Sequence, residues 1–368
     1  MSGGALILLT AGGTGGHVFP AEALADELRG AGHRLALVTD RRGNPDGGAL
    51  GSLERYPISG GGIAGKRATL RLRAILLLAR GYIQARRLIR RLRPAAVVGF
   101  GGYASVPAVL AASHEGIPTL VHEQNAVLGR ANRLLAPRVS CIATSYATVA
   151  RILPRWQGKV RYTGMPVRPA VTRMRDQPYP PQGVRDPLSL LVLGGSQGAR
   201  IFSDIVPAAL LALSQELRQR LSIAQQCRPE DIEAVRHTYG ANGVAAELRS
   251  FFADAPARLA AAHLVISRSG ASTMAELAVV GRPALLVPYL HAIDDHQSAN
   301  ARAFADGGGG WLLPQLGLTA EILADQLQAL LTAPERLSEA AAAARRLGQP
   351  DAARRLAELV TGLIREGR

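Results

Sequence analysis

Aromatic residues, cysteines and long apolar runs are all scarce in this sequence. Phe, Trp and Tyr make up 4% of the 368 residues, which argues against a base-stacking surface for nucleic acid. Cys141 and Cys227 lie far apart and outside any C-x-x-C spacing, so neither a disulfide framework nor a thiolate zinc site is expected. Apolar runs such as residues 74–79 are far shorter than the ~20 residues that span a membrane. Without a secretory leader pattern either, a reducing cytoplasm is the simplest location.

Several common nucleotide and metal motifs are also absent. A G-x-G-x-x-G/A pattern that starts at Gly13 has Val18 where its third small residue should stand, so the NAD fingerprint fails, and no P-loop motif occurs. The zinc-protease motif that begins at His122 and Glu123 fails because its fifth position is Ala126. No Asp-x-Asp pair occurs. NAD oxidoreductases, P-loop NTPases, zinc proteases and Asp-x-Asp metal transferases are therefore disfavoured.

Apolar residues, by contrast, are plentiful. They make up 48% of the chain against 19% charged residues, which is the range of globular proteins. At roughly 150 residues per domain, a chain of this length favours two α/β domains over one.

A strand, a glycine turn and a helix follow one another near the start of the chain. Residues 5–9 form an apolar run typical of a buried strand, 12–16 predict a turn, and 20–28 have the apolar spacing of one helix face. A further strand at 35–39 completes a βαβ unit. This pattern is typical of a doubly wound sheet.

The same pattern returns in the second half of the chain. A Pro-rich stretch at 166–187 precedes a predicted strand at 188–193 and a glycine turn at 194–198. The sequence therefore predicts two Rossmann-like, doubly wound α/β domains that face each other across a cleft. The predicted boundaries are 1–164 for the first domain, 165–346 for the second, and 347–368 for a terminal helix that joins the first.

Three glycine turns follow predicted strands, at 12–16, 101–102 and 194–198. A glycine turn between a strand and a helix lets backbone N–H groups approach a phosphate and places the anion at the positive end of the helix dipole. The glycines are also explained by tight turns alone, as in many α/β proteins. Three such turns together favour more than one phosphate-bearing ligand.

His17 and Glu276 each have two interpretations. His17 follows the first glycine turn, where the helix potential favours the neutral imidazole of a general base, but it is equally explained as a polar cap of the turn. Thr273 and Glu276 match a capping box, in which Glu276 bonds to a backbone N–H of its own helix. Alternatively, Glu276 accepts two ribose hydroxyls, as acidic residues do in nucleotide sites.

Most of the excess positive charge lies in one segment, residues 66–93. This basic segment holds ten Lys or Arg and no Asp or Glu, and so accounts for +10 of the net charge of +15. Its apolar residues have the spacing of an amphipathic helix, which we expect to break near Gly81. Three interpretations are open: a solvated helix face, a surface that docks on anionic lipid, and, less favoured because aromatics are scarce, a nucleic-acid surface.

Seven longer motifs are more specific than these patterns. They are GGTGGHVFPA at 12–21, GFGGYASVPA at 99–108, HEQNAVLGRANR at 122–133, TGMPVRP at 163–169, LGGSQGAR at 193–200, RSGASTMAEL at 268–277 and DDHQSANA at 294–301. In this order they closely resemble the MurG family, the N-acetylglucosaminyltransferases that act on undecaprenyl-diphospho-muramoylpentapeptide. The resemblance extends over about residues 5–305.

The resemblance implies a GT-B fold whose first domain takes the lipid-linked acceptor and whose second takes UDP-N-acetylglucosamine. The implied reaction is inverting transfer of N-acetylglucosamine to the 4-hydroxyl of the muramoyl sugar, a step of peptidoglycan synthesis. It further implies a peripheral enzyme at the cytoplasmic face of the bacterial inner membrane, with the basic segment on anionic lipid. Other cell-wall synthesis proteins are candidate partners, and nucleic acid is not. No metal or cofactor is implied beyond the donor substrate.

Matched motif positions also imply site residues. His17 is the candidate base. The candidate acceptor contacts are Gly101, Gly102 and Tyr103. The implied donor contacts are Thr14, Gly15, Gly16, Asn125, Arg168, Ser196, Phe252, Ala271, Ser272, Thr273, Met274, Ala275, Glu276, His296, Gln297 and Asn300. Among these, Arg168 and Ser196 are implied at the diphosphate, Glu276 at the ribose, and the backbone of Phe252 beside uracil.

Two departures from the family pattern leave positions open. The family's His-Gln-Thr-Gly stretch reads Gln-Gln-Cys-Arg at residues 225–228, so no site residue is carried over there. The loop before Asn300 varies in length among relatives, which leaves the choice between His296 and Gln297 open. The rival functions are another GT-B transferase of lipid acceptors, a UDP-N-acetylglucosamine epimerase, and a non-catalytic basic binding protein.

Overall fold

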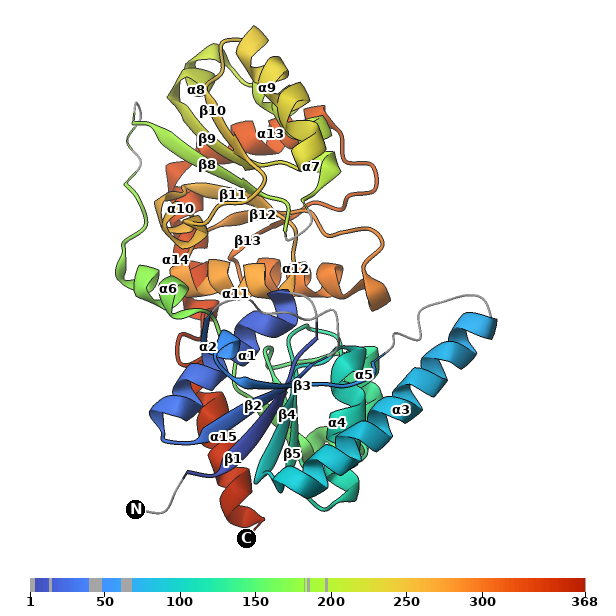
Figure 1. Ribbon diagram of the computed structural model, residues 1–368. Coiled ribbons are helices and arrows are strands. Elements are labelled where there is room, and N and C mark those ends of the chain that lie inside the picture. Colours follow the sequence, from blue (N-terminus) through green and yellow to red (C-terminus); the bar gives the residue numbers. More distant parts are fainter. Residues whose placement is uncertain are drawn as a thin grey trace. The chain divides into compact units, whose positions relative to one another are not determined.

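The chain forms two compact units (Figure 1). The structure is a computed structural model that describes residues 4–12, 15–39, 48–60, 68–181, 183, 186–195 and 198–367. Unit 1 comprises Met1–Arg168 and Gln349–Arg368, and unit 2 comprises Pro169–Gly348. The sequence predicts the boundaries at residues 164 and 346, and the two units divide a few residues later.

The described part of unit 1 contains a parallel sheet in the order β3-β2-β1-β4-β5-β6-β7. Its strands are β1 (Leu6–Thr10), β2 (Arg34–Thr39), β3 (Glu54–Pro57), β4 (Ala96–Gly99), β5 (Thr119–Glu123), β6 (Cys141–Thr144) and β7 (Val160–Tyr162). Its helices are α1 (Gly15–Gly30), α2 (Gly48–Gly51), α3 (Ala68–Leu92), α4 (Gly102–His114), α5 (Arg130–Leu135) and α15 (Ala352–Glu366), with a 3-10 helix at Pro154–Lys159.

The central strand β1 explains why the sheet carries helices on both faces. Its side chains alternate, so Leu8 packs into one core with α3, α4 and α5, whereas Ile7 and Leu9 pack into another with α1 and α15. Leu356 and Val360 of α15 are fully buried in this second core, and Figure 1 shows α15 beside α1. The terminal helix therefore belongs to unit 1, although unit 2 precedes it in the chain.

The expected break near Gly81 is wrong, because α3 runs unbroken from Ala68 to Leu92. Gly81 is buried at the point where α3 meets the loop after β3. A Cβ at this position would overlap the carbonyl oxygen of Ser59 and lie 3.2 Å from Pro107 Cγ. Glycine is therefore needed for close packing and not for a bend.

Unit 2 contains a second parallel sheet, in the order β10-β9-β8-β11-β12-β13. Its described strands are β8 (Leu188–Leu193), β9 (Leu221–Gln226), β10 (Ala246–Arg249), β11 (Leu264–Ser267), β12 (Ala284–Leu286) and β13 (Gly310–Leu312). Its helices are α6 (Pro169–Thr172), α7 (Arg200–Leu211), α8 (Gln215–Arg220), α9 (Ile232–Ala241), α10 (Ala255–Ala261), α11 (Ala271–Val280), α12 (His296–Asp306), α13 (Ala320–Leu331) and α14 (Pro334–Leu347), with 3-10 helices at Arg173–Asp176, Pro229–Asp231 and Ile293–Asp295.

The core of unit 2 lies between its sheet and the helices α7, α9 and α13. Leu190 and Val192 of β8 and Ile266 of β11 point into it and are almost completely buried. Two parallel sheets with alternating helices confirm the predicted class of two doubly wound α/β domains.

Candidate active site

Each sheet has a switch point, where neighbouring strands lead to helices on opposite sides. It lies between β1 and β4 in unit 1, and between β8 and β11 in unit 2. Ligands of such sheets bind outside the carboxyl ends of the strands at this point. The three glycine turns follow β1, β4 and β8, so all of them lie at a switch point.

In unit 1 the imidazole of His17 lies against the second glycine turn. His17 is in the first turn of α1, and Gly101 and Gly102 join β4 to α4 with φ angles of 86° and 71°. A Cβ at Gly101 would lie 3.3 Å from His17 Cε1, and one at Gly102 would lie 3.6 Å from His17 Cδ2. The structure thus brings the candidate base and two candidate acceptor contacts together. The third candidate acceptor contact, Tyr103, follows Gly102 in α4 and is half-buried.

Behind His17 lies a buried histidine, His122, at the end of β5. Its Nε2 is 3.1 Å from the carbonyl oxygen of Gly164, and its Nδ1 is 3.3 Å from Gln124 Nε2, which also donates to the carbonyl of Phe100 at 2.8 Å. Burial lowers the pKa of His122 to about 4; the hydrogen bond to the Gly164 carbonyl opposes this shift, and the nearby His17 contributes to it. The ring is therefore neutral in the folded protein at pH 7, with Nε2–H donating to Gly164.

This burial predicts an acid-sensitive contribution of His122 to stability. The imidazole takes a proton in the unfolded chain below its ordinary pKa of 6.5 but not in the folded chain until about 4, so stability is lost as the pH falls through this window. Between pH 7.5 and pH 5, wild type should lose about 2 kcal/mol more of unfolding free energy than His122→Gln. Urea denaturation of both proteins at the two pH values measures this difference, and an equal loss in both would contradict it.

The next residue, Glu123, belongs to the 122–133 motif, but the sequence assigned it no role beyond a failed zinc motif. Its carboxylate is buried and accepts hydrogen bonds from Asn125 N at 3.0 Å, Asn125 Nδ2 at 3.2 Å, Gly129 N at 2.8 Å and Asn132 Nδ2 at 2.8 Å. Burial raises the pKa of Glu123, and these hydrogen bonds oppose the rise. Glu123 therefore holds Asn125, a candidate donor contact, in a fixed orientation.

The other unit 1 candidates lie on or beside α1. Gly15 and Gly16 begin this helix. Arg168 is the last residue of the first segment of unit 1, and its guanidinium carbon lies 4.5 Å from the ring centroid of Phe19. Thr14 in the first glycine turn and Ser196 in the third lie outside the described residues.

In unit 2 the position at which helix α11 begins decides whether Thr273 and Glu276 form a capping box. The helix begins at Ala271, and Gly270 is its N-cap residue. Thr273 is therefore the third helical residue rather than a cap, and Glu276 lies in the second turn. The capping-box interpretation is wrong. The candidate donor contacts Ala271, Ser272, Thr273 and Ala275 are half-buried, whereas Met274 is buried in the unit.

Ser269, which follows β11, connects the switch point to α12. Its hydroxyl donates to the carbonyl of Gln297 at 2.8 Å, and its own carbonyl accepts from Nδ2 of the buried Asn300 at 3.1 Å. Gln297 Oε1 accepts from Tyr289 N at 2.9 Å, while His296 Nδ1 lies 2.7 Å from the Ile293 carbonyl. Gln297 and Asn300 are therefore held to the segments that follow β11 and β12, whereas His296 bonds to the 3-10 helix just before α12.

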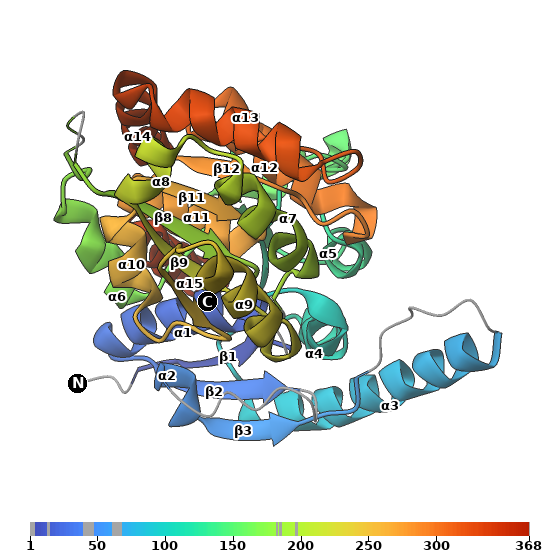
Figure 2. The ribbon, with the colours of Figure 1, turned by 90° about the horizontal axis from the view of Figure 1, so that it is seen from above.

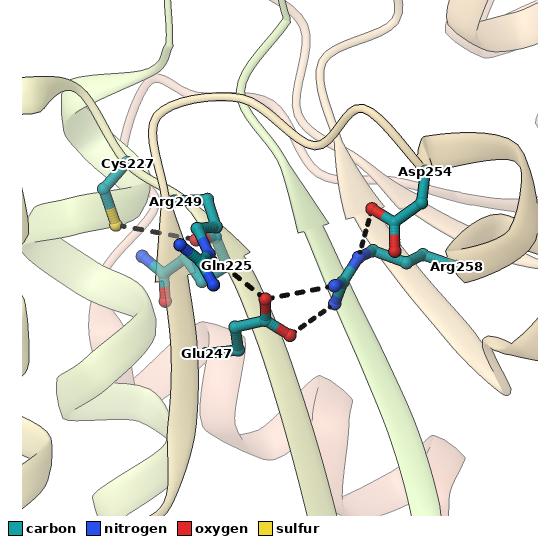
Figure 3. Close-up of polar contacts among 6 residues, drawn as sticks. All are labelled: Gln225, Cys227, Glu247, Arg249, Asp254 and Arg258. Atoms are coloured by element: carbon teal, nitrogen blue, oxygen red, sulfur yellow. Dashed lines mark hydrogen bonds and ion pairs between the residues drawn. The ribbon is translucent and has the colours of Figure 1, made fainter.

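Phe252 lies in a loop after β10 that an ion-pair network closes. Figure 3 shows Arg258 between two carboxylates, with bonds of 2.7 and 3.1 Å to Glu247 and 2.8 Å to Asp254. Its guanidinium carbon also lies 4.4 Å from the ring centroid of the buried Phe252. Hydrogen bonds from Arg258 and from Arg249 lower the pKa of Glu247, so its carboxylate stays charged. The loop is thereby fixed at the end of the sheet.

Arg268 is a second residue that sequence reasoning missed. It lies directly after β11, and its buried Nη1 donates to the carbonyls of Val287 and Pro288 and, at 2.7 Å, to Gln315 Oε1. Burial lowers the pKa of this guanidinium. The only feature of the sequence that pointed to Arg268 was its place as the first residue of the motif at 268–277. Among the described residues, no cluster of three or more His, Cys, Asp or Glu could hold a metal ion.

Comparisons with known proteins cover almost the whole chain. Residues 7–144 match the family model described as glycosyltransferase family 28 N-terminal domain, and residues 189–356 match its C-terminal domain. A relative from Paramagnetospirillum magneticum, named UDP-N-acetylglucosamine--N-acetylmuramyl-(pentapeptide) pyrophosphoryl-undecaprenol N-acetylglucosamine transferase, is 59% identical over 98% of this chain and 97% of its own. This chain belongs to the MurG family. A second relative with the same name, from Rhodospirillum rubrum, is 58% identical over 96% of the chain and 91% of its own.

Solved structures agree with this membership. The crystal structure of Acinetobacter baumannii MurG matches with a TM-score of 0.79 and 30% identity, over 97% of this chain and 99% of the other. A UDP-N-acetylglucosamine 2-epimerase matches with a TM-score of 0.65 at 12% identity, over 96% and 94% of the two chains, and shows the shared fold alone. The predicted family and GT-B fold are thus confirmed, and the chain is a family 28 glycosyltransferase.

Proposed function

We propose that this chain transfers N-acetylglucosamine from UDP-N-acetylglucosamine to the 4-hydroxyl of the lipid-linked muramoyl-pentapeptide named in its relatives, with inversion at the sugar carbon. The observation that carries this proposal is the identity of 59% with such a transferase over nearly the full length of both chains. Glycine turns at the switch points of both sheets support it, because such turns suit diphosphate groups.

His17 is proposed as the general base. It would take the proton of the acceptor hydroxyl as that oxygen attacks the anomeric carbon and the bond from this carbon to the UDP oxygen breaks. Gly101, Gly102 and Tyr103 beside it would hold the acceptor. The electron pair of the broken bond leaves on UDP, whose diphosphate Arg168, Ser196 and backbone N–H groups would stabilise.

The donor contacts that we propose are those at the matched motif positions of the family. In unit 1 they are Thr14, Gly15, Gly16, Asn125 and Arg168. In unit 2 they are Ser196, the backbone of Phe252, residues 271–276 with Glu276 on the ribose, and His296, Gln297 and Asn300 at the sugar hydroxyls. Among the described residues of this set, Asn125 follows shortly after β5, Phe252 lies in the loop after β10, and Ala271 begins the helix after β11, so these three lie near the carboxyl ends of strands, where nucleotide ligands bind doubly wound sheets.

One assay tests the whole proposal. Purified protein is incubated with labelled UDP-N-acetylglucosamine and the lipid-linked muramoyl-pentapeptide, and lipid and aqueous fractions are separated. Label should enter the lipid with an equal yield of UDP. Label that stays wholly in the aqueous nucleotide would defeat the proposal, and release of a rearranged sugar without any acceptor would favour an epimerase.

We further propose that α3 docks this peripheral enzyme on anionic lipid at the cytoplasmic face of the membrane. No helix in the described ranges has the length and apolar character to cross a bilayer. The carboxyl half of α3 packs on α4, and in both views its amino-terminal half extends away from the sheet of unit 1 (Figures 1 and 2). Leu76, Arg80, Ile83 and Arg87 are exposed at helical spacing, so they form one stripe of alternating apolar and basic side chains.

Removing the two arginines of this stripe should weaken binding to anionic vesicles. Each basic residue near anionic lipid contributes ~1 kcal/mol, so Arg80→Ala/Arg87→Ala should lower the partition coefficient roughly 30-fold. Sedimentation with phosphatidylserine-containing and neutral vesicles measures this change. Arg236→Ala/Arg346→Ala, which removes two exposed arginines of unit 2, is the control. Equally weak binding of wild type to both vesicle types would refute the docking surface.

A further inference from the structure

The third glycine turn, residues 194–198, follows β8, and its described residues Gly194 and Gly198 pack tightly against each other. A Cβ at Gly194 would lie 2.5 Å from Ala199 N and 2.8 Å from Gly198 Cα, so no larger residue fits there. A turn of this kind binds a phosphate through its backbone N–H groups, and its carbonyl oxygens would repel the same phosphate. The direction of each peptide group in the turn therefore matters for binding.

Gln226, the last residue of β9, connects this turn to its neighbours. Its Oε1 accepts from Gly194 N at 3.1 Å, and its Nε2 donates to the carbonyl oxygens of Gly195 at 3.2 Å and Ser250 at 3.0 Å. The residue is 8% exposed. Because one side of the amide faces an N–H and the other faces two carbonyls, the contacts also fix which way the amide points.

These three contacts join separate parts of unit 2. Gly194 and Gly195 belong to the turn after β8, whereas Ser250 begins the loop after β10 that carries Phe252. The strand of Gln226 lies between those two strands in the sheet. A single buried amide therefore bridges the glycine turn and the Phe252 loop.

The side chain of the preceding residue, Gln225, points to the opposite face of the sheet from that of Gln226, because successive side chains of a strand alternate between the two faces. It is completely buried, its Oε1 accepts from the Tyr239 hydroxyl at 2.7 Å, and its Nε2 donates to the Phe202 carbonyl at 3.2 Å. These partners lie on α9 and α7 in the hydrophobic core. Gln225 thus stabilises unit 2 through hydrogen bonds to α7 and α9, whereas Gln226 bonds to Gly194 and Gly195 of the glycine turn.

We infer that Gln226 is a positioning residue for nucleotide binding: it holds the glycine turn and the Phe252 loop at the spacing that one nucleoside diphosphate bridges. By bonding the Gly195 carbonyl, it also occupies an oxygen that would otherwise repel the diphosphate. The inference rests on the proposed function for the identity of the ligand as UDP. It concerns a position at which the family pattern assigned no site residue.

The test compares Gln226→Met with Gln225→Met, since each replaces one buried amide by an apolar side chain of similar length. UDP affinity is measured by titration calorimetry, and donor KM, acceptor KM and kcat are measured at steady state. Gln226→Met should weaken UDP binding and raise donor KM about 10-fold or more, with acceptor KM unchanged. Gln225→Met should lower the thermal midpoint at least as much but leave UDP affinity within about 2-fold.

A second variant, Gln226→Glu, keeps the inference testable if Gln226→Met does not fold. Gln226→Glu keeps the side-chain shape and the acceptor for Gly194 N–H, but it loses both donors and adds a negative charge, so it too should weaken UDP binding about 10-fold or more. Unchanged UDP affinity in the folded variants, or an equal loss in Gln225→Met, would overturn the inference. Failure of the wild-type protein to bind UDP would instead count against the proposed function.

Discussion

Replacing His17 by alanine should lower kcat about 100-fold while leaving the affinity for UDP nearly unchanged. The imidazole lies against Gly101 and Gly102 at the switch point of unit 1, where a general base would meet the acceptor hydroxyl. General-base catalysis acts in the transition state, so its loss lowers turnover more than binding. Steady-state kinetics and UDP calorimetry on the same preparation measure the two effects.

The exposed His237 on α9 provides the matched control, and His237→Ala should keep both kcat and UDP affinity. The acidic limb of the kcat profile against pH should also be absent in His17→Ala, because that limb reports the protonation of the base. A turnover close to that of wild type, or loss of UDP binding in step with turnover, would remove His17 from this role.

The second large effect concerns stability and comes from Arg282, which is almost completely buried in unit 2. Its guanidinium donates to the carbonyls of Ala260, Val280, Gly281 and Pro178, at distances from 2.5 to 3.0 Å. Burial lowers its pKa to about 10, so the group is still charged at pH 7. These hydrogen bonds, together with a contact of 5.7 Å between its guanidinium carbon and the ring centroid of Tyr179, join the Pro-rich stretch to α10 and α11.

Arg282→Ala should therefore destabilise unit 2 by about 4 kcal/mol, because it leaves buried carbonyls without donors and creates a cavity. In a unit of this size the thermal midpoint should fall by about 10 °C. Arg282→Lys should recover part of the loss, since an ammonium supplies fewer donors. Arg346→Ala, at an exposed arginine of α14, should change the midpoint by about 1 °C or less. Equal midpoints for Arg282→Ala and Arg346→Ala would contradict this account.

Much of the fold could be predicted from local patterns, because βαβ units have strong periodic signals. The strands before the glycine turns illustrate this, since residues 5–9 and 188–193 were predicted within one residue of β1 and β8. Gly81 was misjudged because its role depends on the Ser59 carbonyl, which is distant in sequence. Thr273 and Glu276 matched a cap only because the capping pattern also fits the interior of a helix that begins at Ala271.

The candidate site was predicted in part, and the reason lies in the distance between partners. Motifs identify residues at fixed local spacing, such as His17 after its glycine turn. Gln226 bonds to backbone groups that are 24 to 32 residues away, so no short motif reveals its role, and only the folded sheet, which places strand ends side by side, shows what it holds. The partners of Glu123 lie only 2 to 9 residues away, inside the 122–133 motif, but the motif does not show that its carboxylate is buried and accepts their hydrogen bonds.

The return of α15 to unit 1 has a consequence for how the protein is made. Leu356, Val360 and Ile364 complete a core whose other members include β1 and α1, near the start of the chain. A ribosome must therefore synthesise all of unit 2 before the last part of that core becomes available. The whole of unit 2 leaves the ribosome before α15 does, so unit 2 can fold during translation while the core of unit 1, although begun earlier, still lacks its last helix.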